Sequence, residues 1–146
     1  DGKWTYWHEN GQVNEERSYN DGNLVSRTNY YYFENGQIRR EENHKDGKKY
    51  GKWTWWFENG QIKQVGNHKD GNLVSRTNYY YFENGQIRRE ENHKEGKQVH
   101  QDGKWTWWFE NGQIKQAGNY KDGDQVGKWT YWHENGQINK IIEKLQ

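Results

Sequence analysis

The chain has 146 residues, enough for one domain, and its 22 Lys and Arg residues nearly balance its 21 Asp and Glu residues. A net charge of +1 argues against a nucleic-acid partner, whose binding surface would need a clustered excess of Lys and Arg. The absence of Cys excludes disulfides, a thiolate nucleophile and a Cys-based metal site, and no apolar run in the sequence is long enough for a transmembrane helix.

The apolar residues are mostly aromatic, with ten Trp, 11 Tyr and four Phe against three Leu, six Val and seven Ile. Because each large ring buries roughly 150–250 Å², we expect a core made of a few aromatic surfaces. The chain also lacks Met, which predicts a processed product or a fragment of a longer array. The compartment stays open between secreted and cytoplasmic.

The phrase Glu-Asn-Gly-Gln recurs along the chain at intervals of 25, 24, 25, 27 and 24 residues, which indicates a repeat array. Residues 22–45 recur letter for letter at 71–94, and residues 51–64 recur at 103–116. Identical copies favour a scaffold over an enzyme. We expect one repeat domain over residues 1–146, with units at about 1–22, 23–47, 48–71, 72–96, 97–123 and 124–146.

Each unit predicts a β-hairpin. In the third unit, strands over residues 52–58 and 61–69 flank Asn59-Gly60, and Asn-Gly favours a two-residue type I′ turn with positive φ at both positions. Such a turn fixes the register of the two strands. The predicted pairs are Glu58–Gln61, Phe57–Ile62, Trp56–Lys63, Trp55–Gln64 and Trp53–Gly66.

The same register pairs residues that change together along the chain. Where Trp stands in the first strand, its predicted partner is either Gly, which leaves room for the ring, or Arg, which can stack on it. Where Asn stands there, its partner is Glu. The pairs are Trp4–Arg17, Trp53–Gly66, Trp105–Gly118, Asn29–Glu42 and Asn78–Glu91.

The predicted fold is all-β, an elongated single-sheet antiparallel meander of about six stacked hairpins with up to twelve strands. Alternation puts one aromatic column on each face. Column one holds Tyr6, Tyr31, Trp55, Tyr80, Trp107 and Tyr131. Column two holds Trp7, Tyr32, Trp56, Tyr81, Trp108 and Trp132. Residues 138–146 predict a terminal cap, with an extended strand favoured over a short helix.

The unit at residues 51–71, GKWTWWFENGQIKQVGNHKDG, resembles the bacterial variant of the MORN repeat, and the resemblance covers the whole chain. It implies an extended meander of hairpins that serves as an interaction or assembly module, in some members a lipid contact, and no enzyme. Many bacterial proteins of this variant carry an antitoxin-like label. Two units depart from the pattern, with Arg27 and Arg76 where other units have Gly51, Gly103 and Gly127. If that glycine bends the strand, curvature alternates along the array.

The polar residues favour structural roles. His44, His68 and His93 share one column, roughly 10 Å apart by hairpin spacing, too far to share a metal ion. His8 and His133 replace Phe at the position of Phe57. The turn glutamates, Glu34, Glu58, Glu83 and Glu110, are expected at exposed loop tips rather than in a catalytic cleft. We expect no cofactor and no metal.

The two aromatic columns are therefore the candidate binding residues. The leading hypothesis is a non-enzymatic scaffold that binds a protein partner or, through its open sheet edges, copies of itself. A second is a secreted carbohydrate-binding module that stacks sugars on the columns. A third, from the resemblance alone, is an immunity or antitoxin protein.

Overall fold

The computed structural model describes residues 1–96 and 98–145, and these residues form strands, turns and loops without a helix. The strands are β1 (Gly2–Trp7), β2 (Val13–Asn20), β3 (Asn23–Tyr32), β4 (Ile38–Lys45), β5 (Lys48–Lys49), β6 (Gly51–Trp56), β7 (Ile62–Lys69), β8 (Asn72–Tyr81), β9 (Ile87–Lys94), β10 (His100–Gln101), β11 (Gly103–Trp108), β12 (Ile114–Lys121), β13 (Asp124–Trp132) and β14 (Ile138–Lys144).

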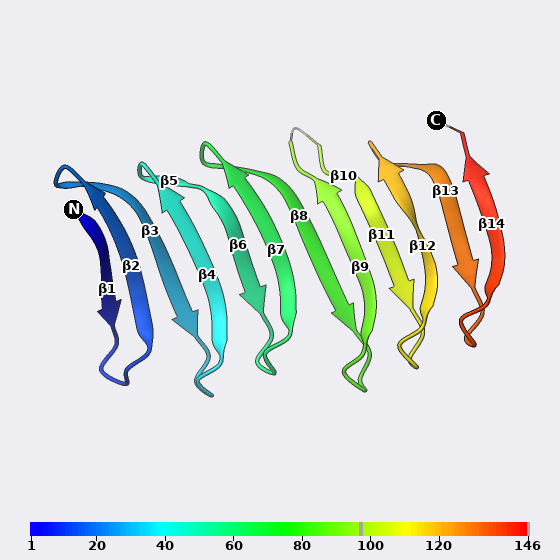
Figure 1. Ribbon diagram of the computed structural model, residues 1–146, viewed down its shortest axis with the longest axis horizontal. Coiled ribbons are helices and arrows are strands. Elements are labelled where there is room, and N and C mark those ends of the chain that lie inside the picture. The colour runs from blue at the N-terminus through cyan, green and yellow to red at the C-terminus, as the bar shows by residue number, and fades with distance from the viewer. Residues whose placement is uncertain (97, 146) are drawn as a thin grey trace. The chain divides into compact units, whose positions relative to one another are not determined.

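The chain divides into two compact units, Asp1–Val74 and Ser75–Gln146. In the first, antiparallel strands follow the order β1-β2-β3-β4-β6-β7, and the two-residue β5 pairs with β4 (Figure 1). In the second, the order is β8-β9-β11-β12-β13-β14, and the short β10 pairs with β9. Within each unit, strands that follow one another in the chain pair side by side, which confirms the predicted all-β antiparallel meander. The short β5 and β10 add to the twelve strands that were predicted.

The Glu-Asn-Gly-Gln loops differ from the predicted type I′ turns. Gly60 N–H donates to Phe57 O at 3.0 Å and Phe57 N–H to Gln61 O at 2.8 Å, which closes a three-residue loop. Gly60 has φ +89°, but Asn59 keeps a negative φ because its side-chain oxygen accepts the Gln61 N–H at 3.0 Å. This is a type I turn followed by a left-handed glycine.

Type I′ turns occur instead at the other ends of the hairpins, at Asp-Gly. Asp46 and Gly47 have φ +50° and +76°, and the flanking Lys45 and Lys48 pair directly. The same geometry recurs at Asp21-Gly22, Asp70-Gly71 and Asp122-Gly123. The sequence contained both signals, and the Asp-Gly dipeptide is the one that forms the two-residue turn.

The predicted register is therefore wrong for the residues next to the loop and correct farther along the strands. Trp56 pairs with Ile62 instead of Lys63, and a bulge follows between Trp55 and Trp56. The longer loop shifts the pairing by one residue and the bulge shifts it back, so the predicted Trp55–Gln64 and Trp53–Gly66 pairs are confirmed. The predicted pairs Glu58–Gln61 and Phe57–Ile62 are corrected in the same way, because Phe57 bonds Gln61.

Farther from the loops, the predicted pairs are confirmed along the chain. They are Trp4–Arg17, Trp105–Gly118, Asn29–Glu42 and Asn78–Glu91. Lys63, the residue predicted to pair with Trp56, places its ammonium 5.6 Å from the Phe57 ring centroid.

Bends in the strands mark the joints between hairpins. Gly51, Gly103 and Gly127 have φ +62°, +91° and +64°, conformations that a side chain would strain. Around Gly51, the β4 ladder passes from β5 to β6, and four residues, 50–53, face only two residues of β4. Arg27 and Arg76 replace this glycine and have no positive φ, but the β2–β3 ladder beside Arg27 still shifts register, between Ser18 and Tyr19.

The core consists of the tryptophans that follow these bends. Trp53 and Trp105 are each 5% exposed and Trp129 is 0% exposed. Gly118 is the partner of Trp105, but the space left by its missing side chain is filled by Trp129 from the next strand. A Cβ on Gly118 would lie 2.1 Å from Trp129 Cδ2. The predicted C-terminal extended strand is confirmed as β14, and Gln146 lies outside the described residues.

Candidate functional site

Column one carries a repeated pair of Tyr and Arg. The Arg40 guanidinium lies 4.2 Å from the Tyr31 ring centroid, and Arg40 Nε is 2.6 Å from a Glu42 carboxylate oxygen. Strand pairing produces this contact, because Tyr31 on β3 directly opposes Arg40 on β4. In the second unit, Arg89 lies 4.3 Å from Tyr80 and pairs with Glu91 in the same way.

The tyrosines at the two ends of column one also lie beside cations. Arg17 lies 4.9 Å from Tyr6, and the Arg17 guanidinium, by bonding Glu15, holds the pKa of that carboxyl below its usual range. Lys140 lies 4.9 Å from Tyr131. Tyr6, Tyr31 and Tyr80 stay exposed, at 39%, 37% and 38%. Each tyrosine of column one therefore lies beside a cation of its partner strand, and three of the four are exposed.

Trp55 and Trp107 occupy column one differently. Trp55 packs on Trp53 with 6.1 Å between ring centroids, and Trp107 packs on Trp105 at 5.6 Å and on Trp129 at 6.0 Å. Both are half-buried. Column one thus combines four tyrosines, three of them exposed, with two half-buried tryptophans that pack on the core.

Column two is less accessible. Trp7 is exposed, but Tyr32, Trp56, Tyr81, Trp108 and Trp132 are half-buried. Tyr32 donates its hydroxyl to Val13 O at 2.8 Å, and its ring meets His8 edge-on at 6.3 Å. The tyrosine therefore fastens β3 to the start of β2.

The histidine column packs on the core tryptophans. Trp53 lies between His44 and His68, at ring-centroid distances of 5.2 and 4.8 Å. Burial, followed by the nearby Lys49, lowers the pKa of His68 below its usual range; burial, followed by Arg27, does the same for the pKa of His44. His93 packs on Trp105 at 5.1 Å. These rings serve as neutral packing surfaces.

A hydrogen-bonded joint connects β4 to β6. Trp53 Nε1 donates to Asn43 O at 2.8 Å, and the Asn43 side chain accepts from Thr28 Oγ1 and donates to Lys52 O. In the second unit, Asn92 links Thr77, Lys104 and Trp105 in the same way. At the joint from β12 to β13, Trp129 Nε1 donates to Asn119 O at 3.2 Å.

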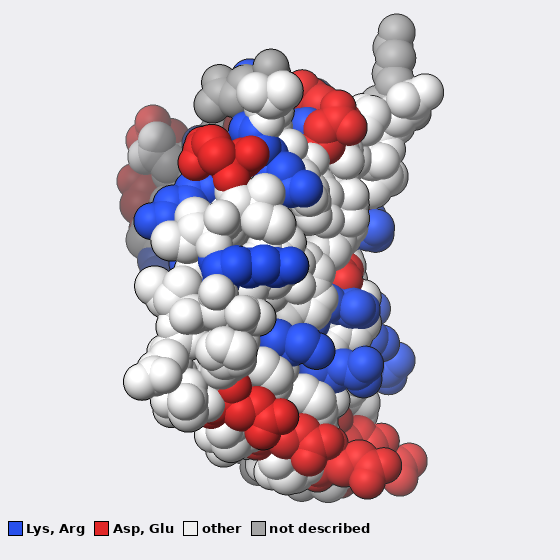
Figure 2. Space-filling model, turned by 90° about the vertical axis from the view of Figure 1, so that its right-hand side faces the viewer, with Lys and Arg blue, Asp and Glu red and all other residues white. Residues whose placement is uncertain are grey.

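The Glu-Asn-Gly-Gln loops also connect neighbouring hairpins, a role that the sequence analysis missed. Gln12 Nε2 donates to Gly36 O, and Asn35 Nδ2 donates to Glu58 O, each at 2.9 Å. In the second unit, Asn111 Nδ2 reaches Glu134 O at 2.9 Å. The loop glutamates are exposed, as predicted, and acidic side chains gather at the end of the strands that carries these loops (Figure 2).

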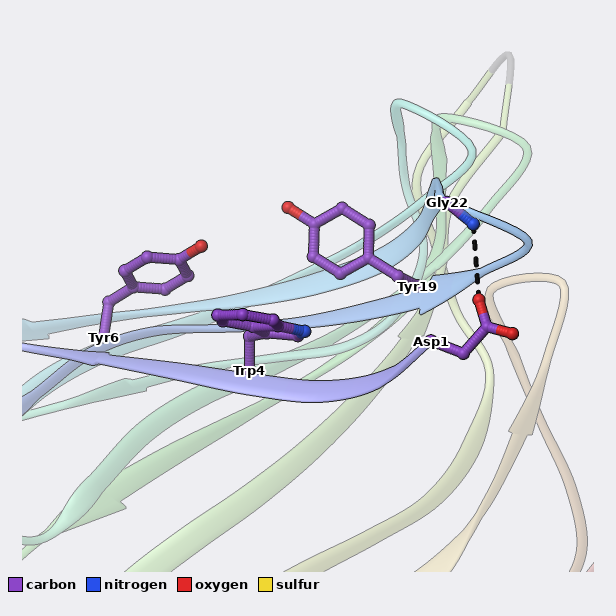
Figure 3. A pocket seen from close by; sticks show the side chains of 5 residues that line it. All are labelled: Asp1, Trp4, Tyr6, Tyr19 and Gly22. Carbon is purple, nitrogen blue, oxygen red and sulfur yellow. Dashed lines mark hydrogen bonds between the residues drawn. The ribbon is translucent and has the colours of Figure 1, made fainter.

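A pocket of about 320 Å³ opens at the β1 edge of the first unit. Trp4, Tyr6 and Tyr19 line it with their rings, and Asp1 Oδ1 accepts the Gly22 N–H at 3.3 Å (Figure 3). Trp4 is 59% exposed, whereas the tryptophans at the same repeat position elsewhere are core residues. The sequence does not reveal this difference, because Trp4 is the same residue type as its buried counterparts.

Within the described residues, no three His, Asp or Glu side chains are placed to hold a metal ion together. The same part of the chain has no helix of the length and apolar character that crossing a membrane requires.

Comparison with protein-family models matches the chain to the MORN repeat variant six times, at residues 1–21, 28–46, 49–70, 77–95, 101–122 and 125–143. A search of curated proteins finds no match.

Proposed function

Because the chain belongs to the MORN repeat variant family, we propose that it is a non-enzymatic repeat scaffold that binds a protein partner through column one and associates with copies of itself through its sheet edges. Repeats of this family typically form scaffolds for protein or membrane interaction. Column two stays a secondary candidate, because most of its rings are half-buried.

The observation that carries the proposal is the repeated Tyr–Arg pair. Tyr and Arg are enriched at protein-binding hot spots, whereas Lys and Glu are depleted there. Tyr31 and Tyr80 present this pair at the same position of two hairpins, with guanidinium-to-ring distances of 4.2 and 4.3 Å. Their Glu partners fix the guanidinium orientation, so little side-chain freedom is lost when a partner binds.

The test compares column variants with a matched control. The double variant Tyr31→Ala and Tyr80→Ala removes two exposed rings of column one, and Tyr50→Ala removes an exposed ring outside the columns that also lies beside a cation, Lys45. Partners captured by the immobilised chain are identified, purified and titrated. We expect the double variant to bind at least about tenfold more weakly, a change of about 1.4 kcal/mol, and Tyr50→Ala to bind like the parent.

Equal binding by both variants contradicts a role for column one. A carbohydrate-binding module or an antitoxin is supported by no specific contact in the described structure. The guanidinium groups already cover one face of Tyr6, Tyr31 and Tyr80, where a sugar ring would stack. Trp fluorescence that shifts on addition of a glycan, but not of the captured protein, would replace the proposed partner class with sugars.

A further inference from the structure

We infer that the chain associates head to tail, with β14 of one copy joining β1 of the next through the same joint that connects β4 to β6 within the chain. This inference rests on the proposed scaffold function, of which it names one partner and its contacts. It commits to a heterologous contact, in which two different edges meet.

The first argument is that the β1 pocket repeats an internal pocket position by position. A pocket of about 370 Å³ in the same unit is lined by Trp53, Trp55, His68 and Gly71, among others. Trp4, Tyr6, Tyr19 and Gly22 hold the corresponding repeat positions in the β1 pocket. The difference is that His44, on the preceding hairpin, covers Trp53, and none of the described residues does this for Trp4.

The second argument is the backbone of β1. Gly2 has φ +100°, in the left-handed region that Gly51 and Gly103 adopt at the internal joints, where φ is +62° and +91°. At those joints the bend aims the following tryptophan at the carbonyl of the preceding strand. The β1 edge is therefore already shaped to receive a strand from a preceding hairpin.

The third argument is the complementarity of the two end loops. In every internal loop contact described above, an Asn or Gln side chain donates forward to a backbone carbonyl of the next loop. In the last loop Asn135 donates to Gln137 at 3.5 Å, as Asn10 donates to Gln12 at 2.9 Å, but among the described residues Gln137 has no loop ahead of it to donate to, and none donates to Glu9 O in the first loop.

The residues that would meet in this joint follow from the corresponding positions of the joint between β4 and β6. Thr5 of one copy opposes Ile141 of the other, and Tyr6 opposes Lys140, as Thr54 opposes Glu41 and Trp55 opposes Arg40. Trp4 Nε1 donates to Glu143 O, and Lys144 covers the Trp4 ring from the position that His44 holds over Trp53. A cation over Trp is favourable, and Lys49 already lies 4.8 Å from Trp53 in this way.

The β14 edge also offers apolar surface for this contact. Ile138, Ile141 and Leu145 are exposed, at 57%, 49% and 95%. An open strand edge with apolar side chains is a template for pairing with another chain. Because the two edges differ, each added copy presents a fresh β14, so the contact produces open chains of copies rather than a closed dimer.

The test uses two variants that block opposite ends. Trp4→Lys blocks the β1 end at an exposed residue. The double variant Asn135→Asp with Ile141→Lys blocks the β14 end, and its Asp retains the acceptor for Gln137 N–H that shapes the loop, at 3.0 Å in the parent. Val99→Lys, at a residue 53% exposed and away from both ends, is the matched control. Near-ultraviolet circular dichroism verifies that each variant is folded.

Sedimentation velocity over a wide concentration range should give a ladder of oligomers for the parent and for Val99→Lys. Each blocked variant alone should associate at least about tenfold more weakly. An equimolar mixture of the two should form a dimer and nothing larger, because only one joint can form.

Dimers of the Trp4→Lys variant alone would overturn the inference in favour of β14–β14 pairing, and dimers of the double variant alone would do so in favour of β1–β1 pairing. A parent chain that stays monomeric while column one still binds its partner contradicts the joint and leaves the scaffold function standing. Oligomers of the parent without partner binding at column one contradict the proposed surface and leave the joint standing.

Discussion

Single glycines decide how the tryptophans of this protein are buried. At Gly118, an added Cβ would lie 2.1, 2.3 and 2.6 Å from three atoms of the Trp129 ring. At Gly66, the nearest atom is Leu73 Cδ1, at 2.9 Å, the end of a flexible side chain. The two glycines hold the same repeat position but face neighbours of different rigidity.

Replacing each glycine by alanine should therefore have unequal effects. Gly118→Ala should lower the free energy of unfolding by about 2–3 kcal/mol or more, because the rigid indole cannot move aside within a packed core. Gly66→Ala should cost about 1 kcal/mol or less, since Leu73 can change its rotamer. Urea unfolding followed by Trp fluorescence measures both values, and equal losses would contradict the described packing.

The buried histidines make stability depend on pH. The pKa of His68 is lowered from 6.5 by burial and then by Lys49, so the unfolded chain binds a proton at higher pH than the folded chain does. The free energy of unfolding should therefore fall as the pH drops below 6.5 and level off once the folded ring is also protonated.

The variant His68→Tyr isolates this effect, because Tyr120 holds the same position in the second unit and packs on Trp105 at 5.0 Å. We expect the variant to lose less stability than the parent between pH 7.5 and 5.5 in urea unfolding. An unchanged pH dependence would show that His68 does not carry it, and His44→Gln would then be the next comparison.

At the scale of strands and loops, the joints rely on one asparagine each. Asn43 bridges Thr28 and Lys52 with its side chain, while its carbonyl accepts from Trp53. Asn119 holds the corresponding position in the joint to β13, but there only the carbonyl is used, by Trp129. The second joint shows that the backbone contact suffices to seat the tryptophan.

Asn43→Ala should accordingly destabilise the protein by about 1–3 kcal/mol, because it leaves a threonine hydroxyl and a backbone carbonyl without their partner. Asn119→Ala should change stability by less than about 0.5 kcal/mol. Thermal unfolding of the two variants side by side gives the comparison. A similar loss in both would mean that the Thr28–Asn43 bridge contributes nothing to the joint.

Strand content and most of the register could be predicted, because aromatic alternation and turn dipeptides are local signals. Asn59 illustrates the limit: Asn-Gly suits a type I′ turn, but the Asn59 side chain captures Gln61 N–H and favours a type I turn instead. The compensating bulge at Trp55 and Trp56 has no sequence signal of its own. The bulge compensates for the three-residue loop, which shifts the pairing of Trp56 by one residue.

For the candidate site, the sequence located the columns but not their accessibility. The Tyr31–Arg40 contact follows from the predicted register, since the two residues oppose each other across β3 and β4. The exposure of Trp4 could not be predicted from the register, because the same residue type at position 53 is buried by the hairpin that precedes it. Burial here depends on neighbours that lie a whole repeat away.

For the molecule as a whole, we propose that function resides in the repeated surface of column one. Tyr6, Tyr31 and Tyr80 are the accessible members of that surface, and Trp53 and Trp105 form the buried reference below it. A bound partner should shield the first group and leave the second unchanged, because the core is already excluded from solvent.

Hydroxyl-radical footprinting of the aromatic side chains, with and without the captured partner, tests this claim most directly. We expect the oxidation rates of Tyr31 and Tyr80 to fall several-fold on binding while those of Trp53 and Trp105 stay low and constant. A partner that binds fully without slowing oxidation at any residue of column one would contradict the account.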